Sequence, residues 1–212
     1  MVGNDVVDLR DRDTDPRTLH ARFDGRVFAA SEQEQLASCD DPVALRWTLW
    51  AAKEATYKVL VKEDPGIVFS PSRFVVALAA GRDVGVVEAG SKAVPFRVAR
   101  EEGAIHVVAT SRATPVVAGL ERLADAEVGA DELGHAVRRL ARERIAAALG
   151  RDPSRVALRK RSRIPELLVD GEPAAADVSL SHHGAVVGFA CELSSTRRAG
   201  RDEAVRLLGS AS

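Results

Sequence analysis

The chain has 212 residues, of which 46% are hydrophobic and 4% aromatic, and its formal net charge is -1. A chain of this size can bury a sizeable core and form one domain or two small ones. Its near-neutral charge and its isoelectric point of about 6.5 argue against a protein that coats nucleic acid through its overall electrostatics.

The first nine residues alternate with a period of two, which predicts a strand. Asp5 lies on the same side of this strand as the apolar Val7 and Leu9, where a charged side chain needs a partner. The alternative interpretation is that Asp5 and Asp8 only end the strand and cap a turn before the acidic stretch that follows. Because Asp5 shares a side with Val7 and Leu9, the interpretation that it has a specific partner is favoured.

The N-terminal residues and the two cysteines give information on the cellular location of the protein. Four acidic residues within the first 13 positions are unlike a secretory or transit peptide, and no apolar run is long enough to span a bilayer. Cys39 and Cys191 lack the spacing of a zinc site or a redox motif, so we interpret them as free thiols. We therefore expect a cytoplasmic location and no membrane partner.

An Asp-Asp-Pro segment predicts the start of a helix over residues 43–62, which an Asp-Pro-Gly turn ends. Both sides of this helix are apolar, yet Glu54 and Lys58 lie one turn apart on it, flanked by two tryptophans. The simple interpretation is a helical salt bridge, worth about 0.2–0.5 kcal/mol at a surface. The second is a divalent cation that bridges Asp5 and Glu54, with a phosphorylated ligand held by Lys58. That arrangement would satisfy all three charges.

The rest of the chain predicts two more groups of elements. Short β-branched runs separated by turn residues predict an antiparallel meander at residues 74–78, 84–87, 94–98 and 104–109. After it, the pattern predicts a helix over residues 132–149 and short strands near residues 156–158, 167–169, 178–181 and 185–192.

These elements predict an α+β fold of two similar halves, each a helix packed on a small, mainly antiparallel sheet. We assign residues 1–124 to the first half, residues 125–195 to the second and residues 196–212 to a polar tail. Ligand sites favour junctions between domains, so a cleft is expected between the halves.

Basic residues are concentrated around the second helix and the strand after it: Arg138, Arg139, Arg142, Arg144, Arg151, Arg155, Arg159, Lys160, Arg161 and Arg163. Because the planar guanidinium group can hold two phosphate oxygens, the cluster as a whole favours anion binding. For any single arginine, a solvated helix face is the simpler interpretation. An RNA-binding domain is a further hypothesis, but the segment lacks interleaved aromatic residues and any RNA-recognition motif, so no nucleic-acid partner is expected.

Residues 179–184, Ser-Leu-Ser-His-His-Gly, end a predicted strand and enter a turn, where hydroxyls, imidazoles and backbone donors could converge on an anion. Ser181 and His182 do not indicate a serine hydrolase, because no Gly-x-Ser-x-Gly segment surrounds the serine and adjacent strand residues point to opposite faces. The chain also has no glycine-rich phosphate loop, which disfavours a Walker-type ATPase and a Rossmann dehydrogenase.

Three segments together resemble the 4′-phosphopantetheinyl transferases, the family of the holo-acyl-carrier-protein synthases and the larger surfactin-synthetase-activating type. Residues 3–7 resemble its Gly-x-Asp motif, residues 50–58 its Trp-x-x-Lys-Glu-(Ala/Ser)-x-x-Lys motif, and residues 180–182 its Ser-His motif. The tryptophan-containing motif is highly specific, and the other two are persuasive in its company. The resemblance extends over residues 3–192, with the two halves in the reverse of the order found in the surfactin type.

The resemblance implies a Mg²⁺-dependent transfer of the 4′-phosphopantetheine arm from coenzyme A to a serine of an apo acyl or peptidyl carrier protein. Adenosine 3′,5′-bisphosphate would be released. Asp5 and Glu54 would hold the metal ion, and either Glu54 or a metal-bound water would take the serine proton. Lys58 would meet the leaving phosphate, with Lys53 a weaker candidate.

The resemblance also implies that Ser181, His182 and Arg142 bind the nucleotide end of coenzyme A. One chain would supply both walls of the cleft, so we expect a monomer. Two departures from the family pattern stand out. Val7 replaces the second acid of the larger type, and Ile164 replaces the lysine of its Gly-Lys-Pro segment. They keep open a non-catalytic module, derived from this fold, that binds coenzyme A or a carrier protein.

Overall fold

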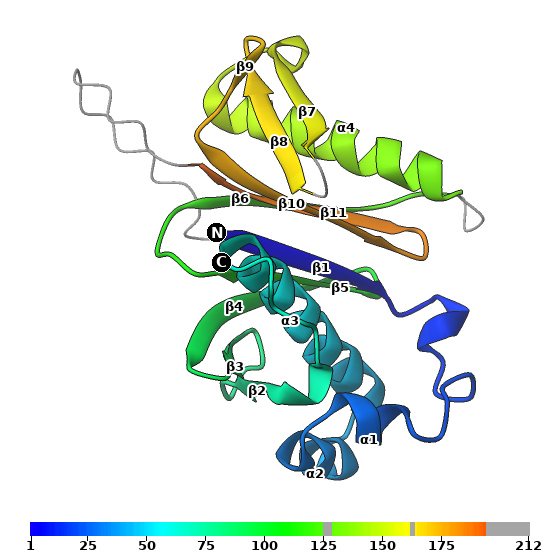
Figure 1. The fold of residues 1–212 in the computed structure, drawn as a ribbon. Coiled ribbons are helices and arrows are strands. Elements are labelled where there is room, and N and C mark those ends of the chain that lie inside the picture. The colour runs from blue at the N-terminus through cyan, green and yellow to red at the C-terminus, as the bar shows by residue number, and fades with distance from the viewer. Residues whose placement is uncertain (125–128, 162–163, 194–212) are drawn as a thin grey trace.

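The computed structural model describes residues 1–124, 129–161 and 164–193. Its helices are α1 (Phe23–Val27), α2 (Ala30–Ser38), α3 (Pro42–Glu63) and α4 (Ala130–Leu149). Its strands are β1 (Val2–Asp8), β2 (Phe74–Leu78), β3 (Val84–Ala89), β4 (Lys92–Glu101), β5 (Ala104–Thr110), β6 (Val116–Arg122), β7 (Val156–Arg161), β8 (Ile164–Val169), β9 (Glu172–Pro173), β10 (Ala176–His183) and β11 (Val186–Leu193). Helices pack on antiparallel sheets, so the fold is α+β, as predicted (Figure 1).

The first half is a five-stranded antiparallel sheet in the order β1-β5-β4-β3-β2, with α3 packed on it. The Asp41 carboxylate accepts a hydrogen bond from the Ala44 N–H, and Pro42 occupies the first turn, which together start α3. Most apolar residues of the helix are buried, Leu49 and Val59 among them at 0% exposure. The predictions of the opening strand, the long helix and the meander are therefore confirmed.

The second half contains the sheet β10-β11-β6, with α4 packed on it, and the small sheet β7-β8-β9. Gly150, at φ +61°, ends α4 in the left-handed conformation that favours glycine. The predicted boundary at residue 124 needs a correction, because β6 forms its ladder with β11. The sheet of the second half thus begins at Val116, inside the segment that the sequence assigned to the first half.

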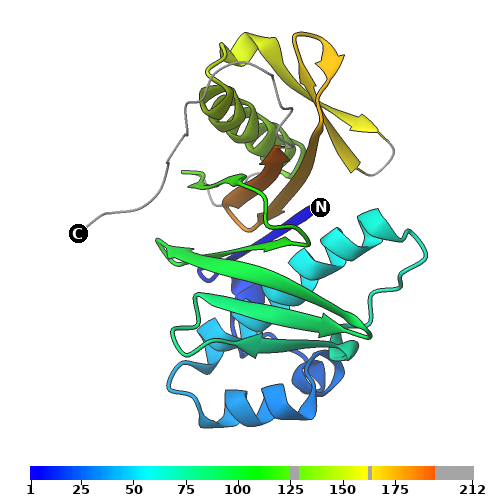
Figure 2. The ribbon, with the colours of Figure 1, turned by 90° about the vertical axis from the view of Figure 1, so that its left-hand side faces the viewer.

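The two halves meet where β1 lies against β10 and β11, and the ribbons show the two sheets stacked one above the other (Figures 1 and 2). A Cβ atom at Gly188 would lie 2.4 Å from Val6 Cγ1, so this glycine permits the close approach of the sheets. Beside it, the Asn4 side chain donates a hydrogen bond to Ser181 Oγ at 2.8 Å and contacts His106 Nε2 at 3.2 Å. One side of β1 therefore faces α3 and the other faces the second half.

Four elements were not predicted from the sequence: α1, α2, β6 and the two-residue β9. The first two cover the segment that follows the acidic stretch, and they pack against the N-terminal part of α3 through residues such as Phe28. No helix in the part of the chain that the structure describes is long and apolar enough to cross a membrane. The predicted polar tail at residues 196–212 lies outside the described residues.

Candidate functional site

Gly3 determines how closely the opening strand approaches α3. A Cβ atom at this position would lie 2.0 Å from the backbone oxygen of Ala55, so only glycine lets β1 lie directly on the helix. Asp5 is on the same side of the strand, two residues further on. Lys58 is about one helical turn beyond Ala55, and its Nζ donates to Asp5 Oδ1 at 2.8 Å and to the backbone oxygen of Asn4 at 2.9 Å.

Asp5 lies close enough to Glu54 for its charge to affect the pKa of Glu54. Burial raises the pKa of Glu54, the charge of Asp5 raises it further, and Lys58 lowers it only in part. Burial also raises the pKa of Asp5, although Lys58 and His183 act in the opposite direction. Within the described residues, the side-chain carboxylate of Glu54 accepts no hydrogen bond and forms no ion pair. The helical salt bridge between Glu54 and Lys58 is therefore not present, because the ammonium is paired with Asp5.

The carboxylates of Asp5 and Glu54 suit a divalent cation. They are oxygen donors, they are partly shielded from water, and the one ammonium group beside them pairs only with Asp5. Among the described residues, no group of three or more His, Cys, Asp and Glu side chains could hold a metal ion, so water and ligand oxygens would supply the other positions. Val7, at 1% exposure, packs in the core under α3 and offers no further acid.

Beside these carboxylates, a groove with a volume of about 770 Å³ opens between the halves. Its lining comes from α3, α4, β7, β8, β10 and the segment after α3: Tyr57, Lys58, Val61, Lys62, Pro65, Gly134, Val137, Arg138, Leu158, Arg159, Lys160, Ile164, Pro165, Val178, Ser179, Leu180 and His182. The walls are mainly apolar, and the charged groups among them are all cationic. Burial lowers the pKa of His182, and the nearby Lys58 lowers it further. The groove therefore suits a ligand that carries negative charge and also has apolar parts.

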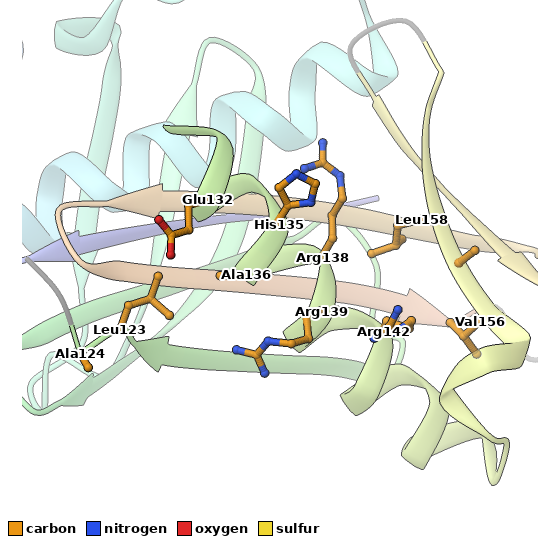
Figure 3. Close-up of a pocket in the computed structure, with 11 residues that line it drawn as sticks. Leu123, Ala124, Glu132, His135, Ala136, Arg138, Arg139, Arg142, Val156 and Leu158 are labelled. Atoms are coloured by element: carbon orange, nitrogen blue, oxygen red, sulfur yellow. The ribbon is translucent and has the colours of Figure 1, made fainter. Parts of the chain in front are cut away.

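Two of the predicted nucleotide-binding residues do not line this groove. Ser181 is buried on the opposite face of β10, where its Oγ accepts the hydrogen bond from Asn4, because alternate residues of a strand point to opposite sides. Arg142 lines an adjoining cavity of about 720 Å³ beside α4, together with Arg139 and His135, and this cavity shares Arg138 and Leu158 with the groove (Figure 3). Of the three residues predicted to bind the nucleotide end, only His182 lies in the groove.

Lys53 has a structural role. Its Nζ donates to Glu32 Oε2 at 2.6 Å and to the backbone oxygens of Pro71 and Phe74 at 3.0 and 2.7 Å. Both side chains of the ion pair are 0% exposed. The prediction that Lys53 meets the phosphate of the ligand therefore needs a correction, since Lys53 lies on another face of α3 than Lys58 and joins α3 to α2 and β2.

The structure adds groove residues that the sequence did not single out as binding residues: Lys62, Arg138, Arg159 and Lys160. Arg138, Arg159 and Lys160 belong to the basic cluster, and the high density of basic residues there was the sequence signal that could have identified them. Lys62 is already paired, because its Nζ donates to Asp177 Oδ1 at 2.9 Å and to the backbone oxygens of Val2 and Val178. Ile164 lines the groove at 43% exposure, while the neighbouring Arg163 lies outside the described residues.

The match to one family model agrees with the sequence motifs. The family model described as "4′-phosphopantetheinyl transferase superfamily" matches residues 1–110. Among solved structures, the chain is similar to the holo-[acyl-carrier-protein] synthase of Thermotoga maritima, with 16% identity and a TM-score of 0.31 over 81% of this chain and 83% of that one. A search of the curated proteins gave no match.

Proposed function

Because the chain belongs to the 4′-phosphopantetheinyl transferase superfamily, we propose that it transfers the 4′-phosphopantetheine arm of coenzyme A to a serine of an apo carrier protein. The reaction would require Mg²⁺ and release adenosine 3′,5′-bisphosphate. One observation carries the proposal: a cationic groove between the halves lies beside Asp5, Glu54 and Lys58. Since one chain supplies both walls, the proposal includes a monomeric enzyme, and we place it in the cytoplasm.

The groove residues divide the work along the ligand. His182 and Arg138, which line the groove, would bind phosphate groups of the nucleotide end, and Lys58 would bind the diphosphate next to the carboxylates. Asp5 and Glu54 would hold Mg²⁺. When bound, this ion offsets the negative charge of the diphosphate and of the leaving oxygen.

Glu54 is also the candidate for accepting the proton of the attacking serine hydroxyl. A general base works best when its pKa is near the working pH, and burial together with Asp5 raises the pKa of Glu54. Its lack of a hydrogen-bond partner among the described residues leaves its oxygens available for this purpose. A water molecule could accept the proton instead, and Glu54 would then act through its charge.

The test is the mass of the acceptor. Incubation with coenzyme A, Mg²⁺ and a panel of apo carrier proteins from fatty acid, polyketide and nonribosomal peptide synthesis should add one phosphopantetheine group to at least one carrier. The Glu54→Gln variant should lower kcat by about 10²-fold or more. Glu63→Gln, on the same helix but paired with Lys92 at the surface, is the matched control and should retain activity.

Glu54→Gln should remain folded. The raised pKa of Glu54 means that its charged form is unfavourable in the folded protein. The stability of the protein therefore falls as the pH rises through this raised pKa. At neutral pH the neutral glutamine should therefore melt at the same temperature as the wild type or higher. Normal turnover by Glu54→Gln would remove Glu54 from the chemistry.

Lys58→Ala should raise the KM for coenzyme A or lower kcat, because it removes the ammonium group nearest to the carboxylates. Lys92→Ala, at the start of β4 and paired with Glu63, is the control. Unchanged kinetics for Lys58→Ala would assign this lysine to the structural pair with Asp5 alone.

The second candidate function is a non-catalytic module that binds coenzyme A or a carrier protein. Two observations favour it: Val7 is buried where the larger type of the family has a second acid, and the groove presents Ile164 where that type has a lysine. Such a module would bind coenzyme A without changing the mass of any carrier. The carrier assay combined with a direct measurement of coenzyme A binding separates the two functions.

A further inference from the structure

The turn between β10 and β11 is fastened to the end of β1 through Asp8, which is 3% exposed. The Asp8 backbone N–H donates to His183 Nδ1 at 3.2 Å, and its Oδ2 accepts the N–H of Ala185 at 3.2 Å. Arg122, on β6, binds both oxygens of the same carboxylate, at 2.9 and 2.7 Å. Asp8 thus joins the strand of the first half to two strands of the second.

Gly184 shows how closely this turn approaches the strand end. Its φ of +54° is unfavourable for other residues. A Cβ atom there would also lie 2.8 Å from an oxygen of Asp8 and 2.8 Å from an oxygen of Asp11. The backbone conformation and the lack of space for a Cβ atom are therefore two independent reasons for a glycine at position 184.

The contact lies close in sequence to site residues of both halves. Asp5 is three residues before Asp8 on β1, and His182 directly precedes His183 on β10. The ring of His183 also lies 6.5 Å from the ring of Trp47 on α3, the helix that carries Glu54. Any change at this contact would alter how far His182 lies from the carboxylates.

We propose that Asp8 and His183 are positioning residues that hold His182 in register with Asp5 and Glu54, through the hydrogen bond from the Asp8 N–H to His183 Nδ1. The inference rests on the proposed function. It assigns work to a histidine outside the Ser-His motif and to an acid outside the Gly-x-Asp motif. Neither side chain lines the groove, so both act through the residues next to them.

The ring nitrogens of His183 can be tested separately. Because Nδ1 accepts the Asp8 N–H, the neutral ring carries its proton on Nε2. Asparagine places an acceptor oxygen near the position of Nδ1, whereas glutamine places its amide near the position of Nε2. His183→Asn should therefore keep the positioning contact, and His183→Gln should lose it.

The experiment compares the kinetics of both variants with those of His20→Gln. His20 is exposed, and its Nδ1 accepts a local hydrogen bond from the N–H of Arg22 at 3.0 Å, so this control loses the same kind of bond away from the groove. His183→Gln should lower kcat about tenfold to a hundredfold, as expected when reacting groups are misplaced by about 1 Å. The KM for coenzyme A should stay within about twofold. His183→Asn and His20→Gln should remain near wild type.

Amide hydrogen exchange at Asp8 gives a readout that does not depend on activity. The Asp8 N–H should be protected in the wild type and in His183→Asn, and it should exchange faster in His183→Gln. Equal exchange and equal kcat in all variants would overturn the inference, as would an equal loss of kcat in His183→Asn and His183→Gln. A wild type that modifies no carrier would refute the proposed function and the catalytic purpose of the contact. The exchange rates would still show whether the contact exists.

Discussion

Replacement of Lys53 by methionine tests the role that the structure gives to this motif lysine. Methionine preserves most of the side-chain length but leaves the fully buried Glu32 carboxylate without its ammonium partner. The backbone oxygens of Pro71 and Phe74 also lose a donor. Breaking a buried ion pair from one side costs about 3–5 kcal/mol, a large part of the 5–15 kcal/mol that stabilises a typical domain.

Urea denaturation followed by circular dichroism measures the loss of unfolding free energy directly. In a thermal melt, Tm should fall by about 2–4 °C for each kcal/mol lost. The folded fraction of Lys53→Met should transfer phosphopantetheine with a KM for coenzyme A near that of the wild type. In a second variant, Lys53→Met with Glu32→Gln, the buried charge is removed and part of the stability should return. A fully stable Lys53→Met protein with a greatly raised KM would refute the reasoning and return Lys53 to the ligand site.

Two further substitutions test the packing and the titration of β1 and its neighbours. Gly3→Ala should lower the free energy of unfolding by about 1–3 kcal/mol or more and slow phosphopantetheine transfer, since its Cβ atom would meet the backbone oxygen of Ala55. The control Gly25→Ala, where a Cβ atom would have nothing within 4 Å, should leave the thermal melt nearly unchanged. Burial lowers the pKa of His106 to about 4, so the unfolded chain takes up a proton between about pH 6.5 and 4 that the folded protein does not. Stability should fall by about 3 kcal/mol as the pH drops through this window, and His106→Gln should abolish that slope in denaturation curves, while an unchanged slope would contradict a buried neutral histidine.

The sequence predicts the two elements that carry the acids because both have clear periodicity. The alternation over β1 places Asp5 on the side that faces α3, and the positions of Glu54 and Lys58 on an apolar helix indicate buried charge. Which charges pair is not a local property. Lys58 is one turn from Glu54, but the distance to Asp5 depends on how closely Gly3 lets the strand approach the helix.

The errors follow from the same distinction. Successive helix residues differ by about 100° in direction, so Lys53 and Glu54 point to different sides of α3, and Lys53 follows Leu49 by one turn on a fully buried face. This signal was available, but the partner Glu32 lies on a helix with a weak sequence pattern. Arg142 was chosen from a dense group of arginines with the help of the family resemblance, and neither density nor resemblance indicates which side of α4 a residue occupies.

The strand β6 was not predicted because its pattern is weak and its pairing is distant. Gly119 interrupts it, and a Cβ atom there would lie 2.7 Å from the ring of Phe189 on β11. The glycine that weakens the local strand signal is thus the residue that the packing of the second half requires. Arg122, at the end of the same strand, then reaches Asp8 across the junction of the halves.

The placement of Asp5 on β1 bears on the electrostatics of the site. Asp5 and Glu54 are two nearby carboxylates with one ammonium group, which pairs with Asp5, and this opposes folding in the absence of a cation, so the surrounding structure must hold them together. β1 is suited to this because it is held on three sides: by its ladder with β5, by α3 at Gly3, and by the second half at Val6. A substitution that loosens either of the last two contacts would let the carboxylates move apart before the protein unfolds. Loss of transfer should therefore precede loss of structure along any series of β1 variants.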